Sequence, residues 1–279
     1  MPQIDYTISG IPLSRYGFSA GVIDGKCNGY DLSGIWSLPK RGGKTHYDWG
    51  IGGGNLGGVE PYTDSDDIVF REREFQLSIV ALCANLGELR TKVDTLYSAI
   101  GDSFTLAHSL LGSYSVRLDK IDLSAYHNGW GQATLKLREL TPLLLSDLTR
   151  LPEKTTPAKD GIDGYTWSEL GLVVSDLANR YDLPQFAPLN LTASSHAIGA
   201  RAPRTITLEG TLLATTYADF QAKADRLRSL IGRAGMRSIK YFDGSTLTAF
   251  CIDGMAVNDV IKFRENCHWG QITCKMITI

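Results

Sequence analysis

The chain has 279 residues, and its 28 Lys and Arg against 30 Asp and Glu give a formal net charge of −2. This balance excludes the basic surface of a protein that coats nucleic acid. The five cysteines form no CxxC pair and no Cys/His cluster with zinc spacing, which predicts reduced thiols. The first ten residues lack the blocks of a signal peptide, and no apolar run approaches about 18 residues. We therefore expect a soluble protein made inside a cell, with no membrane anchor.

The N-terminal third of the chain predicts short strands followed by a long loop. Residues 1–40 mix short apolar pieces with Gly and Pro, consistent with two or three short strands. Residues 41–67 are rich in glycine and show no hydrophobic period, although they carry Tyr47, Trp49 and Tyr62. Loops of this length in compact domains are usually functional or disordered, and disordered segments are normally poor in aromatic residues. The aromatic side chains therefore favour a functional loop.

A strand followed by an amphipathic helix is predicted twice. Residues 70–82 alternate between apolar and polar side chains, as in a half-buried strand. In residues 86–100 apolar side chains recur at three- and four-residue steps before Gly101, which predicts a helix and its C-cap. The same period recurs in residues 217–231 before Gly232, with Thr215 or Thr216 as the N-cap.

Alternating strands follow each helix, so the predicted class is α+β and mainly β. The expected strands are residues 105–110, 114–123 and 131–140 in the first half, and 237–242, 246–252 and 270–279 in the second. Residues 151–164 are rich in Pro, Lys, Thr and Gly, which is typical of a linker. We predict two tandem β-sandwich or barrel domains, residues 1–150 and 165–279, each with one amphipathic helix packed on its sheet.

The motif Trp-Gly-Gln-x-Thr-x-Lys occurs twice and marks a duplication. Its first three residues are Trp130, Gly131 and Gln132 in one copy and Trp269, Gly270 and Gln271 in the other. The helices align at an offset of 131, and Tyr30-Asp31-Leu32 recurs as Tyr181-Asp182-Leu183 at an offset of 151. We expect each Trp to bury a large apolar area and anchor a loop, and each Gly to permit close approach or a bulge. The alternative is that Gln132, Lys136, Gln271 and Lys275 line a subunit interface or a lumen.

The motifs of common enzymes are missing from the sequence. The glycine-rich residues 50–58 are not followed by the Lys-Ser/Thr of a phosphate-binding loop, and Asp64, Asp66 and Asp67 lack the spacing of a calcium loop. The five histidines occur outside any Gly-x-Ser-x-Gly or His-Glu-x-x-His pattern. The sequence therefore predicts a protein that is not an enzyme, without catalytic residue, metal or cofactor.

A strand with Arg73 near its start, a helix ending Leu-x-x-Ile-Gly, a hairpin and a closing Trp-Gly strand together resemble the tail-tube fold of long-tailed bacteriophages. Each half is similar to the ring domain of the distal tail protein family. The resemblance implies a virion protein, assembled in the bacterial cytoplasm, that forms a ring at the distal end of the tail tube. Its implied neighbours are the tail tube protein, the tape measure protein and the proteins of the tail tip or hub, with DNA only passing through the lumen.

A second tube-like copy also resembles the hub proteins of phage baseplates, in which three chains form a pseudo-sixfold ring. The resemblance therefore implies either a trimer or a hexamer of this chain. It departs from the usual distal tail pattern, in which a carbohydrate-module-like domain often stands in place of the second copy. We expect the loop of residues 41–67, with Tyr47, Trp49 and Tyr62, to reach a neighbouring subunit or ring.

Two readings from other classes of protein compete with the ring protein. Exposed aromatic side chains at Trp49, Tyr62 and Trp167 would suit a tandem carbohydrate-binding β-sandwich module for host attachment. A hydrolase with an unrecognised site is the third reading. The ring protein predicts oligomeric rings, the carbohydrate module predicts monomers with saturable glycan binding, and the hydrolase predicts turnover.

Overall fold

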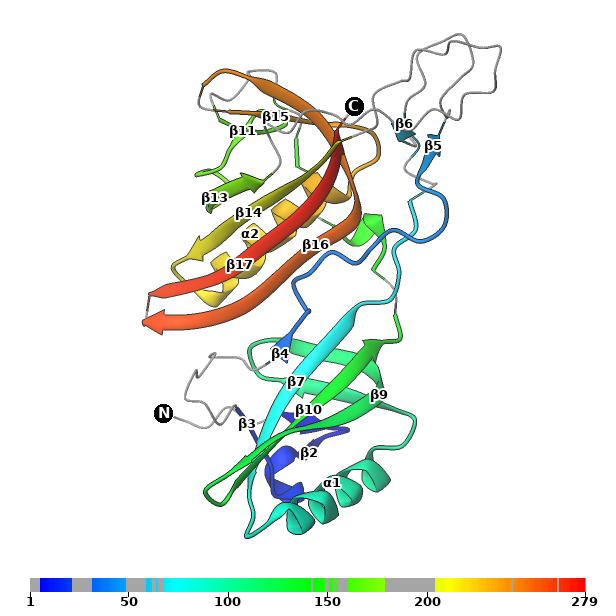
Figure 1. Ribbon diagram of the computed structural model, residues 1–279, viewed down its shortest axis with the longest axis vertical. Coiled ribbons are helices and arrows are strands. Elements are labelled where there is room, and N and C mark those ends of the chain that lie inside the picture. Colours follow the sequence, from blue (N-terminus) through cyan, green and yellow to red (C-terminus); the bar gives the residue numbers. More distant parts are fainter. Residues whose placement is uncertain are drawn as a thin grey trace, which may run out of the picture.

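The part of the protein that the structure describes is mainly β, with two α-helices, two large curled sheets and one two-stranded sheet (Figure 1). The computed structural model describes residues 6–21, 32–48, 59–61, 64, 68–141, 143–148, 151–152, 154, 160–178, 204–241, 243–264 and 266–278. We call the first sheet with its helix unit one and the second sheet with its helix unit two. Within the described residues, no helix is long and apolar enough to cross a membrane.

Unit one is built on an eight-stranded sheet whose neighbouring strands pair antiparallel. Its order is β2 (Ile11–Pro12), β1 (Thr7–Ile8), β8 (Ser103–His108), β9 (Gly112–His127), β10 (Trp130–Glu139), β7 (Glu74–Leu82) and β3 (Ser19–Ala20), and β4 (Leu32–Ser33) also pairs with β7. Helix α1 (Leu86–Ile100) follows β7, and two short 3-10 helices lie at Leu13–Tyr16 and Leu145–Asp147.

Unit two is built on a seven-stranded antiparallel sheet. Its order is β12 (Tyr165–Thr166), β11 (Gly161–Ile162), β15 (Arg237–Lys240), β16 (Thr246–Arg264), β17 (Cys267–Thr278), β14 (Arg204–Ala214) and β13 (Leu172–Ala178). Helix α2 (Tyr217–Gly232) follows β14. The helix therefore occupies the same place between strands as α1 does in unit one.

The two sheets have the same strand order when strands are matched by their place along the chain. The sequence β2-β1-β8-β9-β10-β7-β3 corresponds strand by strand to β12-β11-β15-β16-β17-β14-β13. The first hairpin turns through Ser9 and Gly10 in one unit and through Asp163 and Gly164 in the other, and all four residues have positive φ, between 48° and 82°. Two left-handed residues in succession are what a tight hairpin turn needs.

Each helix packs over the glycine of the repeated motif. The strands alternate, so Gly131 and Gly270 face inward with the apolar residues that follow them. A Cβ at Gly131 would lie 2.6 Å from a methyl of Leu89 in α1, and a Cβ at Gly270 would lie 3.0 Å from the ring of Phe220 in α2. The glycine is thus required by the close approach of helix and sheet, as the sequence predicted.

Both helices begin with the same set of polar contacts. In α1 the side chain of Asn85 accepts a hydrogen bond from the Glu88 amide (3.0 Å), and the Glu88 carboxylate accepts one from the Ala84 amide (2.7 Å). Lys92 donates back to the carbonyl oxygen of Leu82 at 2.6 Å. These contacts satisfy amides of the first turn that have no partner inside the helix.

In α2 the equivalent contacts recur at the offset of 131. Thr216 accepts from the Asp219 amide (3.1 Å), Asp219 accepts from the Thr215 amide (3.1 Å), and Lys223 donates to the carbonyl oxygen of Leu213 at 2.9 Å. Thr216 is therefore the N-cap, one of the two residues that the sequence offered. The ion pair with Lys223 and the hydrogen bond from Thr215 lower the pKa of Asp219.

Two segments differ from the sequence-based expectation. The predicted loop of residues 41–67 contains a short hairpin of β5 (His46–Asp48) and β6 (Val59–Pro61), which the absence of a hydrophobic period did not reveal. The predicted linker of residues 151–164 overlaps β11, which starts at Gly161, and Leu151 is buried. A strand of two residues is too short to show a hydrophobic period, so its formation depends on pairing with a neighbouring strand.

Matched substitutions should show that the two N-caps are equivalent. We expect Asn85→Ala and Thr216→Ala each to lower the free energy of unfolding by about 1 kcal/mol, because each leaves an amide of the first turn without its acceptor. Thr91→Ala is the control, because its hydroxyl only bonds the carbonyl oxygen of Gly87 within the helix. Urea denaturation measures all three, and a loss for Thr91→Ala as large as for the caps would contradict the assignment.

Candidate assembly surfaces

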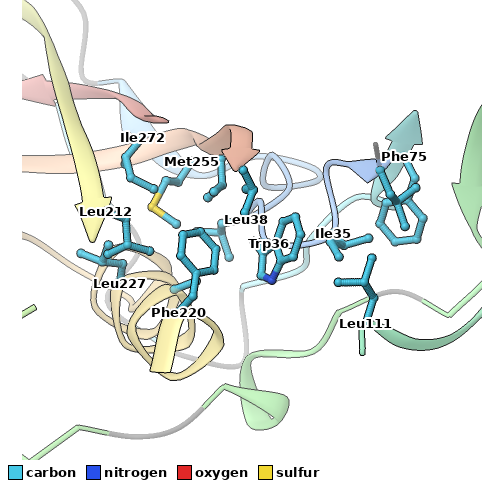
Figure 2. Packing of buried hydrophobic residues seen from close by; sticks show 14 of the residues in the cluster. Ile35, Trp36, Leu38, Phe75, Leu111, Leu212, Phe220, Leu227, Met255 and Ile272 are labelled. Atoms are coloured by element: carbon cyan, nitrogen blue, oxygen red, sulfur yellow. The ribbon is translucent and has the colours of Figure 1, made fainter. Parts of the chain in front are cut away.

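A strap from unit one joins the two units. We define the strap as residues 35–41, which follow β4 of unit one. Ile35, Trp36, Leu38 and Arg41 of the strap are buried, and Trp36 is only 2% exposed. Figure 2 shows Ile35 directed toward Phe75 and Leu111 of unit one, while Trp36 and Leu38 lie among residues of unit two. The strap therefore belongs to the cores of both units, and the buried apolar residues form one continuous cluster.

Trp36 is the anchor of the strap on unit two. Its ring meets Phe220 edge to face, with ring centroids 5.5 Å apart and an interplanar angle of 84°, and it meets Tyr217 at 6.0 Å and 68°. Both partners lie on α2, one turn apart. Edge-to-face aromatic pairs contribute about 0.5–1.5 kcal/mol each beyond the burial of apolar area. One side chain of unit one thus fixes the position of the helix of unit two.

Main-chain hydrogen bonds hold the strap against β16. Leu38 and Met255 form an antiparallel bridge, with N–H to O distances of 2.8 and 2.9 Å, and the hydroxyl of Ser37 accepts from the Val257 amide at 3.0 Å. Gly254 permits this approach, because a Cβ there would lie 2.2 Å from the carbonyl oxygen of Leu38. The strap extends the pairing of unit two at the point where β16 bulges away from β17.

Arg41 closes the strap at the end of α2. Its guanidinium donates to the carbonyl oxygens of Gly232 at 3.3 Å and Arg233 at 2.7 Å. These carbonyl groups lie at the end of the helix, where no intrahelical partner is left and the helix dipole favours a cation. Burial lowers the pKa of Arg41 below its ordinary value.

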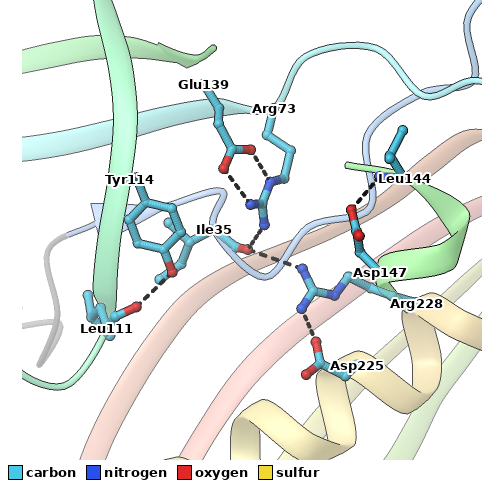
Figure 3. Close-up of polar contacts among 9 residues, drawn as sticks. All are labelled: Ile35, Arg73, Leu111, Tyr114, Glu139, Leu144, Asp147, Asp225 and Arg228. Carbon is cyan, nitrogen blue, oxygen red and sulfur yellow. Dashed lines mark hydrogen bonds and ion pairs between the residues drawn. The ribbon is translucent and has the colours of Figure 1, made fainter. Parts of the chain in front are cut away.

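A second polar cluster lies where the strap leaves unit one (Figure 3). Arg73 makes a bidentate ion pair with Glu139 at 2.6 and 2.7 Å and donates to the carbonyl oxygen of Ile35 at 2.8 Å. Arg228 of α2 donates to the same carbonyl oxygen at 3.3 Å and pairs with Asp225. The carbonyl group of Ile35 therefore joins an arginine of each unit.

The two Trp-Gly-Gln motifs occupy equivalent places, but the prediction that the tryptophan buries a large apolar area is wrong for Trp130, which is 43% exposed. Since Gly131 faces the helix, alternation places Trp130 and Gln132 on the opposite face. Trp269 and Gln271 likewise share the face opposite Gly270, and both are partly exposed. We call this opposite side of each sheet the helix-free face.

An apolar pair stands on the helix-free face in both units. Trp130 is directly opposite Leu82 of β7, and Trp269 is directly opposite Leu213 of β14. Leu82 is 60% exposed and Leu213 is 41% exposed. The repeated Trp therefore covers a neighbouring strand on the outside of the sheet, which is consistent with the alternative that the motif lines an interface or a lumen.

The helix-free face of unit one carries charges of both signs. Arg138 pairs with Asp119 (2.8 Å), Glu72 (3.3 Å) and Glu74 (3.7 Å), and Asp122 pairs with Lys120 and with Lys136. The ion pairs with Lys120 and Lys136 lower the pKa of Asp122. Exposed pairs of this kind add little stability, but they leave the face with interspersed charges rather than a basic patch.

The predicted inter-subunit loop is described in part. Tyr47 of β5 is 46% exposed, while Trp49 and Tyr62 lie outside the described residues. The neighbouring His46 lies 5.8 Å from the ring of Phe250 in β16, so the base of this hairpin rests on unit two. Trp167, which the carbohydrate reading took as exposed, is partly buried and packs against the core.

Buried titratable groups of the described strands include His108 of β8 and His268 and Cys274 of β17. His108 accepts hydrogen bonds from the amides of Leu110 and Leu111, and His268 is buried in β17. Cys274 lies 3.4 Å from Cys251, and the hydrogen bond between the two thiols together with burial raises the pKa of Cys274. The described His, Cys, Asp and Glu side chains form no group of three or more that could hold a metal ion.

The sequence analysis did not predict the strap. Residues 35–41 are too few to show a period, and they stood in a stretch assigned to short strands and a loop. One signal was available, because Arg228 interrupts the apolar side of α2, where it is 7% exposed. A basic residue within an apolar stripe predicts a buried partner, since a charge is seldom buried alone.

Comparison with known proteins gives likenesses among solved structures alone. No family model matches the chain, and no curated protein matches it. Among solved structures the chain is similar to Dit (gp 19.1) of phage SPP1, described as a paradigm of the hub adsorption apparatus in phages infecting Gram-positive hosts. The identity is 12% and the TM-score 0.33, over 99% of this chain and 98% of that chain. A TM-score this low does not place the two chains in one fold.

Gly254→Ala should weaken the docking of the strap. A Cβ at this position would overlap the strap backbone at Leu38 and Pro39, so we expect a loss of about 1–3 kcal/mol beyond the cost of the left-handed backbone itself. Gly244→Ala is the matched control, because its φ of 83° is close to the 79° of Gly254 and no atom lies within 4 Å. Guanidinium denaturation compares the two, and equal losses would contradict the close approach.

Arg73 and Glu139 should behave as a buried ion pair. Their side chains are 12% and 8% exposed, so we expect Arg73→Met to cost about 3–5 kcal/mol by leaving the carboxylate buried without its partner. The double variant Arg73→Met/Glu139→Leu should recover most of this loss. Recovery stays incomplete because the carbonyl oxygen of Ile35 loses the hydrogen bond from Arg73, although it keeps the one from Arg228. Thermal unfolding is compared for the unaltered chain, Arg73→Met, Glu139→Leu and the double variant. If the loss of stability in the double variant equals the sum of the two single losses, the ion pair is not coupled.

Proposed function

We propose that this chain is a structural virion protein that forms a ring at the distal end of a phage tail tube and connects the tube to the tail tip. The observation that carries the proposal is the pair of sheets with one strand order, joined by a strap that covers the helix of the second unit. The chain holds two similar units in contact with each other. Repeating such a pair by rotation about one axis closes a ring of similar units.

The helix-free faces suit the wall of a channel. In unit one this face carries paired charges, and in unit two it carries Thr207, Thr211, Gln271, Thr273 and Lys275. Binding to DNA strengthens with the number of phosphates that are neutralised, so a wall of interspersed charge lets DNA and the tape measure protein pass without holding them. The residues Gln132, Lys136, Gln271 and Lys275 are then lumen-facing in this proposal.

The proposal keeps two ways of closing the ring. Three chains would place six units around one channel, as in a hub, and six chains would place one unit of each chain inside and the other outside. In both, the tail tube protein, the tape measure protein and the tip proteins are the neighbours. The motif residues Trp130, Gly131, Gln132, Trp269, Gly270 and Gln271 form the wall, and the loop with Tyr47, Trp49 and Tyr62 reaches a neighbouring subunit or ring.

Sizing and imaging test the ring. Mass photometry of the purified chain should show a species of three or six times 30.5 kDa, and negative-stain images should show a ring with a central channel. The symmetry of this ring in assembled particles decides between three and six chains. A persistent monomer at high concentration that binds a glycan saturably would overturn the proposal in favour of a tandem carbohydrate-binding module.

A further inference from the structure

The side of α2 that the strap covers has an open counterpart on α1. In α2, Tyr217 contacts Trp36, and Arg228, 7% exposed, donates to the carbonyl oxygen of Ile35. At the offset of 131 the equivalent residues of α1 are Leu86 and Tyr97. These are 42% and 64% exposed. The same side of the helix is thus covered in unit two and uncovered in unit one.

The strand that borders the strap shows the same difference. Met255 and Val257 of β16, which the strap contacts, are 1% and 0% exposed. Val257 is opposite Ile272 of β17, and Leu123 of β9 is opposite Ala133 of β10, which is 139 residues earlier than Ile272. Leu123 therefore stands in the place of Val257, and it is 40% exposed. We call Leu86, Tyr97 and Leu123 the uncovered face of unit one.

We propose that the uncovered face of unit one binds a second copy of this chain, through the segment of that copy that follows β13. The inference rests on the proposed function, since it describes how one chain of the ring meets the next. Within one chain, the segment after β3 and β4 leaves unit one and covers unit two. The corresponding segment of unit two would then leave its own unit and cover unit one of the next chain. When each chain makes this contact with the next, the chains close a ring.

The sequence after β13 carries the apolar spacing of the strap. Phe186 and Leu189 correspond to Ile35 and Leu38 of the strap at the offset of 151, and Leu183 corresponds to Leu32 of β4 just before it. The same offset relates Tyr181 to Tyr30. Residues 179–203 lie outside the described residues, so the correspondence is one of sequence alone. The segment thus repeats two of the three buried apolar positions of the strap, Ile35 and Leu38, with Ala187 in the place of Trp36.

The chemistry of the uncovered face also suits a segment that offers backbone carbonyl groups and apolar side chains. In unit two, Arg228 provides a donor for a strap carbonyl oxygen. In unit one, Tyr97 provides a phenolic hydroxyl at the equivalent helical position, and this group can also donate to a carbonyl oxygen. Leu86 and Leu123 provide apolar area on either side. A tyrosine with one apolar face and one polar end is typical of an interface between proteins.

The double variant Tyr97→Glu/Leu123→Asp tests the contact. Both side chains are exposed, so the isolated chain should keep its unfolding midpoint, while the concentration needed to form the ring should rise on the order of 100-fold from the loss of two apolar contacts. Leu110→Asp/Leu144→Asp is the matched control, because these residues are 49% and 56% exposed outside the uncovered face. Mass photometry over a dilution series should show the control assembling as the unaltered chain does.

A photoreactive side chain at position 97 identifies the occupant. With p-benzoylphenylalanine in place of Tyr97, we expect crosslinks to residues 179–203 of another chain, identified by mass spectrometry of mixed isotope-labelled and unlabelled protein. Crosslinks confined to one chain, or a ring unaffected by the double variant, would overturn this inference and leave the proposed ring intact. An unaltered chain that stays monomeric at every concentration would overturn the ring and the inference together.

Discussion

The structure depends on the insertion of Trp36 of unit one beside the helix of unit two. The side chain is 2% exposed and lies edge to face on Phe220. Burial of a Trp supplies several kcal/mol, a large share of the net stability of a domain. Because the same strap keeps Ile35 in the core of unit one, neither unit completes its core alone. The two units are therefore expected to unfold together.

The geometry of the strap explains why two glycines and two arginines stand where they do. Gly254 removes a side chain so that the backbone of Leu38 can approach β16, and a Cβ at Gly232 would lie 3.2 Å from the ring of Phe70 and 3.5 Å from a methyl of Leu38. Arg73 and Arg228 supply donors to the one carbonyl oxygen of Ile35 that would otherwise be buried without a full set of partners. These polar contacts fix the direction of the strap, while Trp36 is its largest buried side chain.

The sequence predicted what depends on period and on repetition. The helices, the N-cap Thr216 and the inward alternation of Ala133 and Leu135 follow from local pattern, and the structure confirms them. The predicted glycine C-caps are confirmed only in position for Gly101, whose φ of 70° and ψ of −171° are not those of a left-handed helical residue. Gly232 lies within α2, whose C-cap is Arg233. The exposure of Trp130 follows from the same alternation, because Trp130 lies on the strand face opposite Ala133 and Leu135. The sequence analysis predicted its burial from the size of the side chain instead. The strap could not be predicted from the sequence, because its contacts with unit two join residues about 180 or more positions apart, as between Trp36 and Tyr217 or between Arg41 and Gly232.

Coverage by the strap explains why α2 is more buried than α1. In α1 only Leu89, Leu96 and Ile100 are buried, as expected of a helix that lies on one sheet, whereas α2 buries eight residues, Arg228 and Ser229 among them. The units share one strand order, so the fold of a unit does not require the additional burial. The strap and its surroundings produce it, which means that a unit of this kind presents a partly apolar helix side until a neighbour covers it. Unit one presents that side at Leu86 and Tyr97.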